Sequence, residues 1–222
     1  MRNVPTPSGR FAFQLYFDDV GEIDEICLEA LKKQSLLAPT PTPVRIERFV
    51  EKQFRTTVRY EDLGPDNLGC TIFNSSGAVE AILVSRSLEE QNTTPARRRV
   101  RSTVAHEAGH GLLHGSLFIG DNFLDRGKNQ RRILCRSEDI LVETQSSYRG
   151  RWWEFQANQA IGSLLLPRPL MNAFLDQSGV KPDSSGRCNL TLSERESLAK
   201  KAAMTFDVNP IVVRIRLDSL FP

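Results

Sequence analysis

The sequence lacks the features typical of membrane proteins, disulfide-framed domains and proteins that bind nucleic acid over their whole surface. No stretch of its 222 residues approaches the ~18 consecutive apolar residues of a membrane span. The N-terminus shows no basic start followed by an unbroken apolar segment, so we expect no signal peptide and a cytoplasmic protein. The four cysteines form no C-x-x-C pair and are expected to be reduced thiols. With 29 Lys and Arg against 27 Asp and Glu, the net charge of +2 is too small for a surface that tracks nucleic acid throughout.

The rest of the composition is typical of a globular chain, with 40% apolar and 25% charged residues. Periodicity predicts helices over 18–37, 46–54, 95–114 and 152–166, two more in the last forty residues, and short strands near 11–17, 56–60, 70–73, 79–85 and 133–141. A hairpin turn is expected at Ser75, Ser76 and Gly77. In the C-terminal pair, Ser193 and Glu196 predict a capping box.

One of these helices carries a pattern that points to a metal ion. His106, Glu107 and His110 spell H-E-x-x-H within the helix over 95–114. Four residues turn a helix by ~400° and advance it ~6 Å, so both imidazoles project from nearly the same face. Glu107 is placed to take a proton from a water that a zinc ion activates. Random placement of three His and 15 Glu would give this pattern in only ~0.3% of such chains, so an ordinary helix with two histidines is the weaker interpretation.

A catalytic zinc site needs a third protein ligand. Glu154 is the best candidate because it opens an apolar helix, with Asn158 one turn later on the same face. Asn158 could then bind the far nitrogen of a ligating histidine. The alternative is a solvated carboxylate favoured by the helix dipole. The acids that compete with Glu154 open no comparable helix: Asp121, Asp125, Glu138, Asp139 and Glu143.

The third histidine, His114, follows one turn after His110 in the sequence. On a continuing helix it lies another ~6 Å away, which is too far to share the ion. We therefore expect His114 to pack against the site or to support a ligand rather than to bind the metal.

Two segments of the chain match the hallmarks of a known family. They read V-R-S-T-V-A-H-E-A-G-H-G-L-L-H and E-F-Q-A-N-Q-A-I-G-S-L-L-L-P. This pair resembles the ImmA/IrrE-type zinc metallopeptidases, with a looser similarity over 46–170. The resemblance implies zinc ligands His106, His110 and Glu154 with Glu107 as the catalytic residue. It also implies an endopeptidase that cuts a protein, often a helix-turn-helix repressor, in stress or mobile-element responses.

The chain departs from that family pattern in a long, Arg-rich insert, since 43 residues separate His110 from Glu154. All three histidines lie in one helix, so a donor for the transition-state oxyanion has to be a Tyr, an Arg or the backbone. The candidates just before the Glu154 helix are Tyr148, Arg149 and Arg151, although a solvated charge run is the simpler interpretation of each. For the substrate, we expect the strand over 79–85 to offer a free edge to an extended peptide.

These observations predict an α+β fold of the zincin type, with a small antiparallel or mixed sheet beside the H-E-x-x-H helix and a helical C-terminal piece. Residues 1–180 would form the metallopeptidase domain with a helical lead-in, and residues 188–222 a helical subdomain packed on it. Four arginines lie in the first turns of the H-E-x-x-H helix, where the helix dipole disfavours cations. A solvated charged face is the favoured interpretation of Arg97, Arg98, Arg99 and Arg101, and an acidic neighbour is the alternative.

The predicted function is a zinc-dependent endopeptidase with a protein substrate, for which a transcriptional repressor is the leading candidate, and without a membrane partner. One alternative is a DNA-binding regulator with a structural or degenerate metal site, because the C-terminal helices are similar in pattern to a helix-turn-helix. Acidic residues such as Glu194 and Glu196 dilute the field of Arg214 and Arg216, so packing is favoured over DNA binding. A second alternative is a hydrolase of non-peptide substrates. Glu107 favours an enzyme over a regulator, because a structural site needs no general base.

Overall fold

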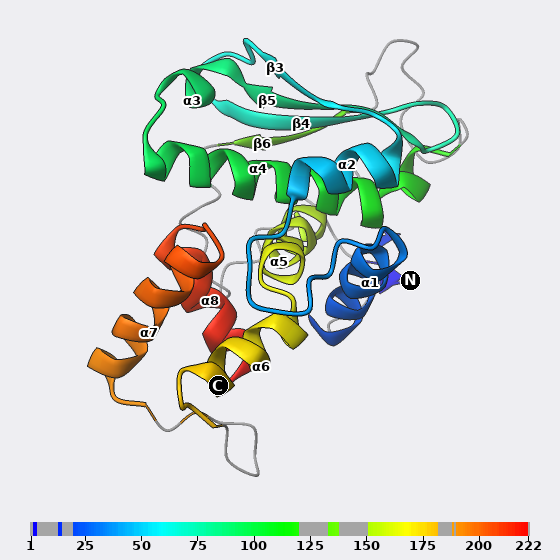
Figure 1. Cartoon of the computed structure of the whole chain (residues 1–222). Coiled ribbons are helices and arrows are strands. Elements are labelled where there is room, and N and C mark those ends of the chain that lie inside the picture. The colour runs from blue at the N-terminus through cyan, green and yellow to red at the C-terminus, as the bar shows by residue number, and fades with distance from the viewer. Residues whose placement is uncertain are drawn as a thin grey trace.

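The protein folds into three layers (Figure 1): a small sheet, the long helix α4 (Thr94–Leu113) beneath it, and a group of helices on the far side of α4. The computed structural model describes residues 2–3, 13–14, 20–119, 133–137, 151–181, 188 and 190–221. The predicted α+β class, with a small sheet beside the H-E-x-x-H helix, is confirmed.

The main sheet is mixed, with strand order β3-β5-β4-β6 among the described residues. Its strands are β3 (Val58–Glu61), β4 (Asn67–Phe73), β5 (Val79–Ser85) and β6 (Ile133–Ser137); a separate two-stranded ribbon pairs β1 (Arg2–Asn3) with β2 (Phe13–Gln14). β3 runs parallel to β5, and β4 is antiparallel to both of its neighbours. Because β5 pairs with β3 on one side and β4 on the other, the prediction that the strand over 79–85 has a free edge is wrong.

The turn between β4 and β5 forms where the sequence predicts it. The Asn74 Oδ1 accepts hydrogen bonds from the backbone N–H groups of Ser76, at 2.9 Å, and Ala78, at 3.0 Å. Gly77 has a φ of +75°, a conformation that other residues rarely adopt. A Cβ on Gly77 would lie 2.3 Å from the carbonyl oxygen of Gly115. This turn therefore packs directly against η1 (Gly115–Phe118), which follows α4.

Helix α4 begins with a side-chain cap, since Thr93 accepts the backbone N–H of Ala96 at 3.3 Å and Pro95 lies in the first turn. Every residue from 102 to 110 is buried. The sheet and α2 (Ile46–Phe54) lie on one side of α4 and α5 (Trp152–Leu165) on the other (Figure 1). A helix covered on several sides needs no polar stripe, so its buried polar residues require a specific explanation.

The remaining helices are α1 (Val20–Lys33), α3 (Arg86–Glu90), α6 (Arg168–Gln177), α7 (Leu192–Thr205) and α8 (Pro210–Leu220). The sequence analysis did not predict α6. The predicted capping box of α7 is wrong by two residues, because the reciprocal hydrogen bonds join Thr191 to Glu194 rather than Ser193 to Glu196. The helix begins at Leu192, so Ser193 is already inside it.

A buried polar cluster joins α8 to the layer that carries Glu154. Arg216 on α8 is only 3% exposed, and its Nη1 donates to the Oδ1 of Asp24 on α1 at 2.7 Å. Its Nε donates to the carbonyl oxygen of Leu166 at 3.0 Å, and the hydroxyl of Ser163 on α5 also bonds to Asp24. Apolar residues of α1, α5, α7 and α8 share one core cluster. Helix α8 therefore packs against α5 through both apolar and charged contacts, and α7 packs on α8.

Arg98 and Arg101 have the acidic neighbour that was the less favoured alternative, namely Asp207 in the turn between α7 and α8. The Nε of Arg98 donates to its carboxylate at 3.0 Å, and the Nε of Arg101 donates to its backbone carbonyl at 2.9 Å. On α8, Arg214 donates to both carboxylate oxygens of Glu196. Arg214 and Arg216 are thus engaged in ion pairs within the protein.

The cysteines are not all reduced, contrary to the prediction. Cys70 on β4 is disulfide-bonded, whereas Cys27 and Cys188 are buried thiols that form no disulfide. Burial raises the pKa of the Cys27 thiol far above its ordinary range, so it stays protonated. Among the described residues, no helix combines the length and the apolar character that crossing a membrane would require.

Candidate metal centre

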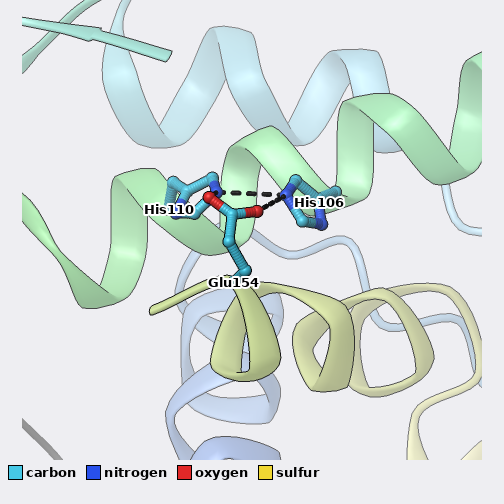
Figure 2. A group of neighbouring side chains, drawn as sticks. All are labelled: His106, His110 and Glu154. Atoms are coloured by element: carbon cyan, nitrogen blue, oxygen red, sulfur yellow. Dashed lines mark hydrogen bonds and ion pairs between the residues drawn. The ribbon is translucent and has the colours of Figure 1, made fainter. Parts of the chain in front are cut away.

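The metal centre lies between α4 and α5, which cross closely at this point. His106 and His110 project from α4, and Glu154 projects toward both of them from the first turn of α5 (Figure 2). Gly109 allows this approach, because a Cβ there would lie only 2.6 Å from the Cβ of Ala160 on α5. The helices can therefore come near enough for ligands from both to reach one ion.

The three candidate ligands converge on one point. The Nε2 atoms of His106 and His110 lie 3.0 Å apart. Glu154 places Oε2 at 3.2 Å from the Nε2 of His106 and Oε1 at 3.5 Å from the Nε2 of His110. A tetrahedral ion with bonds of about 2.0–2.1 Å holds its ligand atoms about 3.3–3.4 Å apart. These separations fit such an ion, and this buried His-His-Glu group could bind a metal.

Each histidine uses its other ring nitrogen for a second contact. The Nδ1 of His106 lies 3.0 Å from the Oδ1 of Asn158, and the Nδ1 of His110 lies 2.9 Å from the Nδ1 of His114. An amide oxygen only accepts, so His106 carries its hydrogen on Nδ1 and keeps the lone pair of Nε2 for a metal. The structure thus places Asn158 where the sequence analysis put it, behind a candidate ligand.

The charge of the site follows from its burial and its neighbours. Burial alone would raise the pKa of Glu154, but its interactions with His110 and His106 outweigh burial and hold this pKa well below its ordinary value. Burial, with His110 close by, holds the pKa of His114 well below its ordinary value too. Glu154 is therefore an anionic ligand and His114 is a neutral imidazole at pH 7.

The candidate base Glu107 points toward the sheet rather than toward α5. The Oγ1 of Thr71 on β4 lies 2.7 Å from the Oε2 of Glu107 and 2.9 Å from its backbone carbonyl oxygen. A Cβ on Gly69 would lie 2.8 Å from the Oε1 of Glu107, so the absence of a side chain on Gly69 leaves the space that this carboxylate fills. All of these side chains are buried. Strand β4 therefore fixes where Glu107 lies.

The other candidates from the sequence are less informative. Arg151 is exposed just before α5, and its carbonyl oxygen accepts the N–H of Glu154 at 3.0 Å. Tyr148 and Arg149 lie outside the described residues. The same is true of the acids that competed with Glu154: Asp121, Asp125, Glu138, Asp139 and Glu143.

Four residues of the site were missed: Gly69, Thr71, Gly109 and Gln156. Gln156 had a usable signal, since it is a polar residue between Glu154 and Asn158 in an otherwise apolar helix. Thr71 had none, because strand alternation does not reveal which side chain meets a particular helix residue.

Neither a comparison with protein-family models nor a search of curated protein sequences returned a match for this chain.

Proposed function

We propose that this protein is a zinc-dependent metallopeptidase of the zincin type, similar to the ImmA/IrrE family. The observation that carries the proposal is the convergence of His106, His110 and Glu154 at tetrahedral ligand spacing, with the buried carboxylate of Glu107 next in the chain to the first ligand. Three protein ligands are typical of a catalytic zinc site, because they leave one position for water or substrate.

The residues divide the work between holding the ion and moving a proton. Zinc, when bound, supplies a Lewis acid that polarises a carbonyl and lowers the pKa of water to about 7. Glu107 takes the proton of the attacking water and delivers it to the leaving amine nitrogen. The hydroxyl of Thr71 keeps the Glu107 carboxylate in place, at 2.7 Å from its Oε2. Because these groups are buried, their electrostatic interactions are stronger than they would be in water.

The substrate class is proposed from the family resemblance. Endopeptidases of the family that this chain resembles cut protein substrates, often a helix-turn-helix repressor, so such a repressor is the first substrate to test. The ion pairs of Arg214 and Arg216 support a packing role for α8 over DNA binding, which weakens the alternative of a DNA-binding regulator.

The test uses purified protein with generic unstructured proteins and with any repressor encoded beside its gene. We expect about one zinc per chain by elemental analysis. Glu107→Gln should retain that zinc, while cleavage falls by about 10²–10⁴-fold because the variant lacks a base. Glu89→Gln, an exposed substitution on α3, is the matched control. Cleavage by Glu107→Gln at the parental rate would refute the mechanism, and operator binding without cleavage would favour the regulator.

A further inference from the structure

We propose that Gln156 is a positioning residue that acts through His114 to make His110 a competent metal ligand. The proposal rests on the metal site of the proposed function, but it does not depend on the reaction catalysed there. Gln156 reaches the candidate ligands through His114, which contacts His110, so we expect its effect on the ion to pass through His110.

The contacts form a chain of three buried side chains. The Nδ1 of His110 lies 2.9 Å from the Nδ1 of His114, and the Nε2 of His114 lies 3.1 Å from the Oε1 of Gln156. None of the three is more than 1% exposed. The indole of Trp152 packs edge-on against the His114 ring, with centroids 5.5 Å apart, and so restricts the rotation of that ring. The last member of this hydrogen-bonded series is the amide of Gln156, which lies on the same helix as Glu154.

Two nitrogens that face each other share one hydrogen, so one donates and the other accepts. The contact between His110 and His114 could therefore run in either direction. If His114 donates, His110 holds its own hydrogen on Nε2, the atom that faces Glu154, and cannot bind a metal there. If His110 donates, its Nε2 has a free lone pair that can bind the ion.

Gln156 selects the second direction because it presents its oxygen to His114. An oxygen only accepts, so His114 must carry its hydrogen on Nε2 and offer a bare Nδ1 to His110. His110 then donates from Nδ1 and keeps Nε2 for the metal. With the amide reversed, its NH₂ group would donate to the Nε2 of His114, and His114 would donate from Nδ1 to His110. His110 would then carry its hydrogen on Nε2, and that atom could not bind the metal.

The same logic applies to His106, whose Nδ1 meets the Oδ1 of Asn158 without an intermediate. Both ligating histidines of α4 are therefore oriented by amide oxygens of α5, one directly and one through His114. Helix α5 supplies all three functions in the segment E-F-Q-A-N: the third ligand Glu154 and the two amides. Partners of this kind typically contribute about 10–100-fold to metal affinity.

The test compares three substitutions on α5. Gln156→Leu has no acceptor, Gln156→Glu keeps an acceptor that cannot reverse, and Gln159→Leu alters a neighbouring half-buried glutamine outside the chain of contacts. We expect the zinc Kd to rise about 10–100-fold in Gln156→Leu, measured by competition with a chromophoric chelator. The Kd should stay within about threefold of the parent in Gln156→Glu and Gln159→Leu.

A second measurement needs neither zinc nor a stable variant. Long-range ¹H–¹⁵N correlation spectra of the metal-free parent should show His114 protonated on Nε2 and not on Nδ1. A His114 protonated on Nδ1, or a Gln156→Leu variant with parental zinc affinity, would overturn the proposal. If the zinc affinities and the His114 tautomer are as expected but no peptide is cleaved, only the proposed peptidase activity is contradicted. If the protein cleaves peptides but Gln156→Leu binds zinc as tightly as the parent, only the role of Gln156 is contradicted.

Discussion

The close approach of α4 and α5 predicts an unusual effect for a Gly109→Ala substitution. Within an exposed helix such a change would stabilise the protein by about 1 kcal/mol, because alanine is the better helix former. Here the new Cβ would lie 2.6 Å from the Cβ of Ala160 and 3.3 Å from the carbonyl oxygen of Ala157. Two carbon atoms rest about 3.5–4.0 Å apart, so the helices would have to separate by about 1 Å.

A separation of that size matters more for metal binding than for folding. Overpacking of a core costs about 1–3 kcal/mol, which the better helix propensity of alanine partly offsets. Zinc coordination tolerates only about 0.2 Å, and the carboxylate that must reach the histidines lies on the helix that moves. We therefore expect Gly109→Ala to lose about 0–2 kcal/mol of stability and at least about tenfold in zinc affinity.

Gly111→Ala is the matched control, since it adds the same group to the same helix on a different side. Its Cβ would lie 2.8 Å from the Cζ of Phe54 and from the Cγ2 of Val79, which are side chains of α2 and β5 rather than of α5. Urea denaturation of the metal-free proteins gives the stabilities, and competition with a chromophoric chelator gives the affinities. The reasoning is refuted if Gly109→Ala binds zinc as tightly as the parent, or if Gly111→Ala loses as much affinity.

Three further predictions test other parts of the structure. Thr71→Val removes a hydrogen bond to the Glu107 carboxylate, which is worth about 1.5–3 kcal/mol. We therefore expect kcat/KM to fall about 10–100-fold with zinc content unchanged, and a variant that cleaves like the parent would contradict this. Asp24→Ala leaves the guanidinium of Arg216 buried without its carboxylate and should lower the free energy of unfolding by about 3–5 kcal/mol in urea; a loss below about 1 kcal/mol would contradict the role of this pair. Zinc at a hundredfold over its Kd should add about 2.7 kcal/mol, or about 5–11 °C in Tm, and a thermal scan unaffected by a chelator would argue against binding to the folded site.

The positions of the metal ligands could be predicted because helix geometry is rigid over a few residues. The spacing of His106 and His110 fixes their relative direction wherever the helix lies, and the same holds for Glu154 and Asn158 on α5. What spacing could not reveal is that the two helices cross with only 2.6 Å of room for a Cβ at Gly109. That contact depends on packing between segments that are distant in the sequence.

The errors share a physical origin in long-range pairing and in ambiguous local signals. The strand over 79–85 was expected to offer a free edge to a substrate peptide, but its side chains are largely apolar on both faces and only the pairing with β3 and β4 decides its position. The capping pattern occurs twice in overlapping form, at Thr191 and at Ser193, and the helix uses the first. Helix α6 was not predicted because a proline after a helix is as typical of its end as of the first turn of a new helix, and Pro169 lies in the first turn of α6.

The division of labour between the two helices explains why α5 has to be placed so accurately. Helix α4 carries the candidate base Glu107 and two candidate ligands whose mutual geometry its own backbone guarantees, whereas the groups that position these side chains come largely from other elements. Strand β4 holds the candidate base Glu107 through Thr71, and α5 supplies Glu154 and the two amides that contact His106 and His114. A displacement of α5 would therefore disturb the third ligand and both tautomers at once. This is why we expect substitutions at the α4–α5 contact to affect metal binding well beyond their effect on stability.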